Sequence, residues 1–220
     1  KGYQISQYDQ PIVLGGNLNG IRIRRIHLEE DTGRLLHDEK GATLVDFNRA
    51  GVPLMELVTE PDIKSADEAI NFSKELQLIF RYLGVSEANM EKGELRIEAN
   101  VSLNKGTKVE LKNINSFAAA RDAIDYELKR QSEVLESGGK VEQETRGWDE
   151  VKKKTVSQRT KEEAHDYRYF PEPDLPPFET SVFGIENLKI SIPELPKEKR
   201  TRFASEYSLN QGQVGVLVED

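Results

Sequence analysis

The fold is best approached from Val45-Asp46-Phe47-Asn48-Arg49-Ala50-Gly51-Val52-Pro53-Leu54-Met55-Glu56-Leu57-Val58. Apolar residues on both sides of a Gly and a Pro predict two strands joined by a turn. The stretch also carries four polar side chains, Asp46, Asn48, Arg49 and Glu56. A buried polar group without a partner costs about 2–7 kcal/mol, so we expect each to be paired or to bind a ligand. The plainer alternatives are a hydrogen-bonded turn around the glycine and, for the glutamate, a solvent-facing position.

A second acidic group lies just upstream, in His27-Leu28-Glu29-Glu30-Asp31-Thr32-Gly33. A solvated turn is the simplest explanation of an acidic triplet, and the histidine alone indicates nothing. The functional explanation is a Mg²⁺ site, because this ion takes roughly six oxygen ligands and usually only a few carboxylates. Two acidic clusters so close in a chain without cysteine therefore suggest a hard cation and a phosphate.

Composition narrows the class of protein. The chain has 220 residues, a formal charge of −8 and no cysteine. Disulfides, thiolate zinc sites and a cysteine nucleophile are excluded, and a duplex-binding domain would more often be basic. No long apolar run, signal-peptide pattern, phosphate-binding P-loop or dinucleotide-binding glycine motif occurs. The chain starts without methionine and stops just after an apolar run, so we expect a fragment cut at both ends.

Local patterns predict two long helices among short strands. Ser65-Ala66-Asp67-Glu68 is a capping box, and a second helix begins near Asn115-Ser116 and closes at Gly138-Gly139. The expected strands lie within 1–26, 42–47, 95–103, 109–111 and 141–170, and a further helix lies at 197–207. Because helices and strands do not alternate regularly, the sequence indicates an α+β fold with a mainly antiparallel sheet.

The clearest strand is Leu95–Leu103, in which apolar and polar residues alternate. Arg96, Glu98 and Asn100 share one face, with neighbours about 7 Å apart. Such a row suits a solvent-facing sheet surface, and it equally suits a catalytic surface on which cation and carboxylate hold metal and phosphate. Lys112 and Asn115 precede the second helix, where free backbone N–H groups can bind phosphate, although an ordinary N-cap is the alternative.

The longest motifs identify a family. The chain closely resembles the B subunit of the aspartyl/glutamyl-tRNA amidotransferases from end to end. The stretches that carry the resemblance are Tyr3–Gln7, His27–Gly33, Val45–Val58, Glu60–Asp62, Glu110–Phe117 and Asp166–Asp174.

The resemblance implies an ATP-dependent carbon–nitrogen ligase that corrects misacylated tRNA. ATP phosphorylates the side-chain carboxylate of Glu on tRNA(Gln), or of Asp on tRNA(Asn), and ammonia from the glutaminase, the A subunit, then displaces the phosphate. The implied assembly is a cytoplasmic or organellar heterotrimer of the A, B and C subunits, without membrane or DNA contact. The implied fold is a cradle over 1–190, similar to the catalytic domain of glutamine synthetase, followed at 191–220 by the start of a helical domain.

The resemblance also implies site residues. Glu30 and Glu56 are the expected Mg²⁺ ligands that converge on one ion, and Glu29, Glu98 and Asn100 are further candidates. Arg96 and Lys112 would stabilise charge on the transferring phosphoryl group, and Lys112 and Asn115 would contact nucleotide phosphate. Members of the family carry a Gly-Leu-Glu-Val-His motif that completes the metal site and that this sequence lacks. We therefore expect the fragment to be inactive alone and to bind metal weakly.

Two other functions remain open at this point. One is a non-catalytic tRNA-binding or assembly protein of the same complex, whose carboxylates lie on the surface. The other is a relative that acts on a free amino acid.

Overall fold

The computed structural model describes residues 4–37, 41–160, 172–177 and 179–219. It divides into two compact units that interleave along the chain: unit 1 is Lys1–Ile63 with Glu162–Ile185, and unit 2 is Lys64–Lys161 with Glu186–Asp220. This division concerns compactness, and the domain boundary predicted at residue 190 stays a prediction. The α+β class is confirmed.

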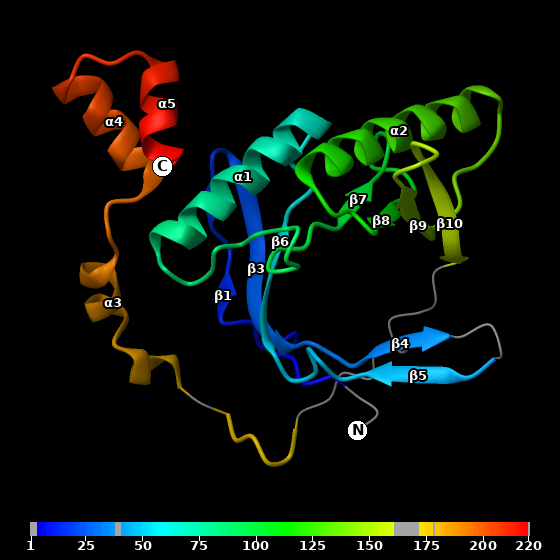
Figure 1. Ribbon diagram of the computed structural model, residues 1–220, viewed down its shortest axis with the longest axis horizontal. Coiled ribbons are helices and arrows are strands. Elements are labelled where there is room, and N and C mark those ends of the chain that lie inside the picture. The colour runs from blue at the N-terminus through cyan, green and yellow to red at the C-terminus, as the bar shows by residue number, and fades with distance from the viewer. Residues whose placement is uncertain (1–3, 38–40, 161–171, 178, 220) are drawn as a thin grey trace. The chain divides into compact units, whose positions relative to one another are not determined.

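Unit 1 is built around one long strand, β3 (Ile21–Glu30) (Figure 1). One edge of β3 pairs antiparallel with β1 (Val13–Leu14) and β2 (Asn17–Leu18), and the other edge pairs antiparallel with β6 (Pro53–Thr59). A separate antiparallel hairpin joins β4 (Arg34–His37) to β5 (Thr43–Asp46). The strands predicted within 1–26 and 42–47 are confirmed, β4 was not predicted, and β3 extends further than its apolar–basic alternation indicated.

The turn between β5 and β6 uses the polar residues that the sequence singled out. Asp46 accepts a hydrogen bond from the Asn48 amide at 2.8 Å, and Arg49 donates to buried Asp31 at 2.8 Å. Gly51, which has a φ of 81°, donates its amide to the Asp31 carbonyl at 2.9 Å. A hydrogen-bonded turn, the plainer alternative, therefore accounts for the side chains of Asp46 and Arg49, and Asn48 takes part in it through its backbone amide.

Unit 2 contains a four-stranded sheet in the order β10-β9-β8-β7. Its strands are β7 (Ala99–Val101), β8 (Val109–Lys112), β9 (Glu144–Asp149) and β10 (Lys154–Thr160). All pairs are antiparallel except β8 and β9. The helices are α1 (Ala66–Tyr82) and α2 (Phe117–Glu136), and α2 covers one face of the sheet (Figure 1). Apolar side chains from both helices and three strands form the main core here.

Both long helices begin where the sequence predicted. The Ser65 hydroxyl accepts from the Glu68 amide at the start of α1, and the Ser116 hydroxyl accepts from the Ala119 amide at the start of α2. Gly84 and Gly138 follow the helix ends with φ values of 67° and 78°, a conformation in which glycine has no Cβ penalty.

The strand predicted over 95–103 is wrong in length, because only β7 pairs with a neighbour. Leu95 and Ile97 pack against the core, which explains their alternation with polar residues. They have no strand partner, because Asn113 adopts a left-handed φ of 60° directly after β8 and directs the chain toward α2. Of the strands predicted within 141–170, β9 and β10 are present, and residues 161–170 lie outside the described residues.

A buried charge network fastens α2 to the sheet of unit 2. The fully buried Glu127 carboxylate accepts hydrogen bonds from Arg130 (2.7 and 3.0 Å), Gln131 (2.9 Å) and Thr155 (3.1 Å). Arg146 on β9 donates to Thr155 at 2.9 Å and pairs with Glu144 at 2.6 Å.

The C-terminal helices of unit 2, α4 (Pro196–Glu206) and α5 (Gln211–Glu219), pack onto α1. Arg200 forms a bidentate pair with buried Glu75 at 2.7 and 2.9 Å. Lys199 donates to the Tyr82 hydroxyl, which in turn donates to the Val218 carbonyl, both at 2.8 Å. These contacts join residues 117 to 136 positions apart in the chain.

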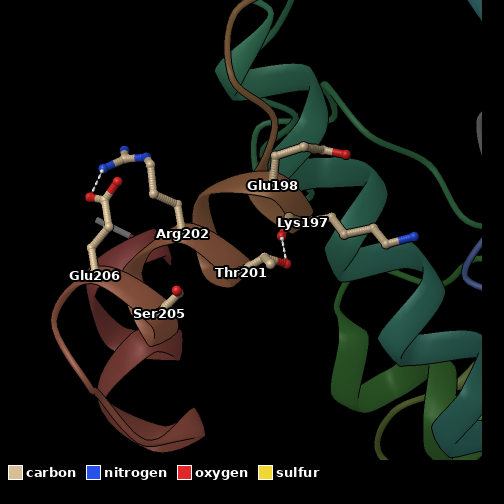
Figure 2. A pocket seen from close by; sticks show the side chains of 6 residues that line it. All are labelled: Lys197, Glu198, Thr201, Arg202, Ser205 and Glu206. Carbon is tan, nitrogen blue, oxygen red and sulfur yellow. Dashed lines mark hydrogen bonds and ion pairs between the residues drawn. The ribbon is translucent and has the colours of Figure 1, made fainter.

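Two short helices precede this pair: η2 (Thr180–Phe183) and α3 (Ile185–Ser191). The outer side of α4 carries a shallow hollow in which basic and acidic side chains balance, and Arg202 pairs there with Glu206 at 3.2 Å (Figure 2). None of the helices in the described part of the chain has both the length and the apolar character needed to cross a bilayer.

Candidate metal centre

Three potential metal ligands meet on one face of unit 1. His27 and Glu29 are two residues apart on β3 and therefore point to the same side of the strand. The register of β6 places Glu56 directly opposite His27. One ligand atom from each side chain lies within 4.8 Å of the other two, and among the described residues this is the group of three able to share an ion.

The distances within this group suit a shared cation. His27 Nε2 lies 3.4 Å from a Glu29 oxygen and 3.8 Å from a Glu56 oxygen. Ligands on a common ion with bonds of about 2.1 Å are roughly 3–4 Å apart, so little movement would be required. The His27 side chain is fully buried and the Glu56 side chain is 45% exposed, so the group is reachable from solvent on the glutamate side.

The electrostatics of the group favour a positive charge. Burial, together with the negative charge of Glu56, raises the pKa of Glu29 above its ordinary value, although the nearby His27 opposes the shift. A raised carboxyl pKa means that the folded site disfavours the charged form. A bound cation would remove that penalty by neutralising both carboxylates.

The donor set fits a divalent cation. Two carboxylates suit Mg²⁺, and one neutral imidazole makes Mn²⁺ or Zn²⁺ equally acceptable on chemical grounds. The buried Nδ1 of His27 has no hydrogen-bond partner in the described part of the chain. This leaves Nε2 as the ring nitrogen that faces the carboxylates.

The structure does not bring Glu30 to Glu56, so their expected convergence on one ion is wrong. Glu30 follows Glu29 by one residue and is paired opposite Pro53, which puts its side chain on the other face of the strand pair. Its carboxylate instead accepts from the Ile5 amide at 3.3 Å. The acidic partner that β3 supplies to Glu56 is Glu29.

The edge of β3 next to the cluster is covered by the N-terminal segment. Ser6 forms a bridge with Glu29, and Gln7 donates its amide to the Leu28 carbonyl at 2.8 Å. This pairing sets the Tyr8 ring edge-on to His27, with centroids 6.0 Å apart. The Arg25 guanidinium stacks on the Tyr8 ring, 4.4 Å from its centroid.

The remaining predicted site residues lie in unit 2. Arg96, Glu98 and Asn100 are exposed, and Asn100 pairs in register with Glu110. Lys112 donates to Glu98 at 3.1 Å and lies 3.8 Å from Glu110, so its ammonium already faces two carboxylates.

The start of α2 has an ordinary N-cap. Ser116 is the capping residue, and Asn115 is exposed one position before it. The first turn of α2 contains no acidic side chain, so its N-terminus is compatible with an anion without indicating one.

Sequence reasoning missed His27 and the aromatic and basic groups beside it. The available signal was the spacing of His27 and Glu29, which places both on one face of any strand. The histidine could not be assigned to the site without the register of β6, because that register places Glu56 directly opposite His27.

The family model and the most similar relatives that we compared all point to one protein family. The family model described as the GatB/GatE catalytic domain matches residues 1–185. The aspartyl/glutamyl-tRNA(Asn/Gln) amidotransferase B subunit from Caldicellulosiruptor saccharolyticus is 53% identical over 99% of this chain and 48% of its own length. The same protein from Thermodesulfovibrio yellowstonii and from Myxococcus xanthus is 52% identical, over 100% of this chain and 49% of each relative. The chain thus spans about half the length of these relatives.

Proposed function

The chain belongs to the GatB/GatE catalytic domain family, and on that premise we propose that it forms part of the catalytic subunit of an aminoacyl-tRNA amidotransferase. The names of its relatives, each a B subunit, support a role within a larger assembly that acts on tRNA. The proposed partners are the glutaminase (the A subunit) and the C subunit.

The proposed reaction has two steps. A side-chain carboxylate oxygen of Glu on tRNA(Gln), or of Asp on tRNA(Asn), attacks the γ-phosphorus of ATP, and ADP leaves. Ammonia then attacks the acyl carbon, and phosphate leaves with the electrons of the C–O bond to give the amide. The antiparallel pairing of β3 with β6 is compatible with a cradle similar to the glutamine synthetase catalytic domain, which we also propose.

The observation that carries the proposal is the convergence of His27, Glu29 and Glu56. These residues would hold the divalent cation of ATP, which supplies neutralisation of charge on the transferring phosphoryl group. Glu29 and Glu56 provide the negative charge. The buried His27 would supply the third ligand atom, its ring nitrogen Nε2. The exposed Glu56 side leaves room for ligand oxygens and water, which complete the coordination that Mg²⁺ prefers.

The residues of unit 2 enter the proposal as charge stabilisers. Lys112 and Arg96 would contact developing negative charge, and Asn115 would contact nucleotide phosphate. Glu98 and Asn100, expected as further metal ligands, stay predictions, and Glu98 is paired with Lys112 at 3.1 Å. The Lys112 ammonium already faces Glu98 and Glu110, so this part rests on residue type alone.

The decisive experiment replaces the acidic residues in the full-length protein assembled with its partners. Glu29→Gln and Glu56→Gln should each reduce ATP-dependent amidation of Glu-tRNA(Gln) by about 100-fold or more, because a ligand to a catalytic cation is lost. Glutaminase activity should remain. Glu30→Gln is the matched control, since its side chain lies on the opposite face and should leave the dependence on Mg²⁺ unchanged. Normal amidation by both Glu29→Gln and Glu56→Gln would refute the proposal and favour a non-catalytic assembly role.

A further inference from the structure

A cationic side chain with unused donors lies beside the metal cluster. Arg25 is two residues before His27 on β3, and its Nη2 is 3.8 Å from a Glu56 oxygen. That separation is too long for a hydrogen bond. Its Nε is buried and has no partner within the part of the chain that the structure describes. A buried guanidinium N–H without an acceptor is costly, so an acceptor is expected when the site is filled.

The position of Arg25 is set independently of Glu56. Its guanidinium carbon lies over the Tyr8 ring, 4.4 Å from the centroid, and Tyr8 also contacts His27 edge-on. The pairing of Ser6 with Glu29 holds this segment along β3. This cation–π contact uses none of the N–H donors, which stay available to an anion, and arginine binds phosphate and carboxylate groups through those donors.

The charges also indicate an anion. The cluster has two carboxylates, so a divalent cation would bring Glu29 and Glu56 to neutrality. Arg25 would then be the surplus positive charge at the filled site. Arg24, the preceding residue on β3, differs because its side chain is 63% exposed and pairs at 3.9 Å with Glu60, outside the cluster.

We propose that Arg25 binds an anionic oxygen of the ligand that the cation at His27, Glu29 and Glu56 carries. The shared chemistry is a phosphoryl or carboxylate oxygen, supplied by the nucleotide or by the aminoacyl side chain. The inference rests on the proposed function and adds a substrate-binding residue to it.

The test uses the full-length protein in its complex, with Mn²⁺ as the probe cation. Wild type, Arg25→Met and Arg24→Met are compared for binding of Mn²⁺ alone, by electron paramagnetic resonance, and of ADP in the presence of Mn²⁺, by calorimetry. Arg25→Met should bind Mn²⁺ alone as tightly as wild type or more tightly, because a like charge has been removed. Its affinity for ADP should fall by about 10- to 100-fold, the loss typical of charged hydrogen bonds. Arg24→Met should match wild type in both measurements.

A second ligand distinguishes the two sources of the anion. If the aminoacyl carboxylate is the group bound, ADP affinity stays unchanged and the KM for Glu-tRNA(Gln) rises by the same factor instead. Either result supports the proposal. Tyr8→Leu, at a half-exposed position, removes the aromatic contact of Arg25 and should weaken binding of the same ligand that Arg25→Met weakens. Agreement between the two variants would show that the loss in Arg25→Met is not a folding defect.

Two results would overturn the assignment of Arg25 and leave the proposed function standing. The first is unchanged affinity for both ligands in a variant that still binds Mn²⁺. The second is weaker binding of Mn²⁺ itself, which would make Arg25 an orienting partner of Glu56. If Glu29→Gln and Glu56→Gln both leave Mn²⁺ binding unaltered, the metal site fails and the proposed function fails with it.

Discussion

Replacing Glu127 with leucine tests whether the buried charge network of unit 2 is structurally decisive. The substitution removes the acceptor of two Arg130 hydrogen bonds and of one each from Gln131 and Thr155. Breaking a buried ion pair from one side typically costs about 3–5 kcal/mol. Glu144 still lies 2.6 Å from Arg146, and the Arg130 side chain is 20% exposed, so part of the charge stays compensated. We therefore expect a loss of about 3 kcal/mol.

The assay is urea unfolding followed by tryptophan fluorescence. Trp148 is the only tryptophan of the chain, and it lies buried on β9 against Tyr126 of α2. With a slope of about 1–3 kcal/mol per molar urea, the midpoint should fall by about 1–3 M. Lys129→Ala, an exposed change on the same helix, should leave the midpoint in place. A midpoint for Glu127→Leu equal to that of Lys129→Ala would refute the assigned role of the network.

Two further predictions concern acid stability and charge stabilisation. Burial raises the pKa of Glu144, but hydrogen bonds from Ser157 and Arg146 outweigh it and hold the pKa below the usual 4.5. This carboxylate therefore stabilises the fold above pH 4.5 and loses that contribution as pH falls through the lowered pKa. In Glu144→Gln, the free energy of unfolding measured by Trp148 fluorescence should fall less steeply below pH 4.5 than in wild type. An unchanged pH dependence would contradict this. Lys112→Met in the full complex should lower amidation about tenfold or more with glutaminase activity intact, whereas Lys108→Met, an exposed change just before β8, should not. Equal rates for the two lysine variants would remove Lys112 from the mechanism.

Local signals in the sequence predicted the helices well. Ser65 and Ser116 are N-caps because their hydroxyls satisfy free amides of the first turn, and that chemistry depends only on neighbouring residues. Strand pairing depends on partners far along the chain. The segment from Leu95 has the alternation of a strand and packs on the core, yet it stays unpaired because the backbone at Asn113 turns away.

The metal cluster also depends on strand pairing that the sequence does not reveal, here to within one residue. The resemblance placed Glu30 beside Glu56, with Glu29 as a further candidate, and strand alternation alone cannot say which of two adjacent glutamates faces Glu56. The register that sets Glu56 opposite His27 selects Glu29 and rejects Glu30. The contribution of Arg25 was equally hidden, because its stacking partner Tyr8 reaches β3 through the pairing of a separate segment.

The long chain separation between α1 and the helices that cover it has a consequence for biosynthesis. Glu75 must wait for Arg200, which lies 125 residues later. At about 5–20 residues per second, translation leaves that carboxylate and its apolar neighbours on α1 uncovered for roughly 6–25 s. Over that interval the uncovered face of α1 on the nascent chain is accessible to chaperones. Variants that weaken the Glu75–Arg200 pair should therefore show their defect first as a poor yield of protein during expression.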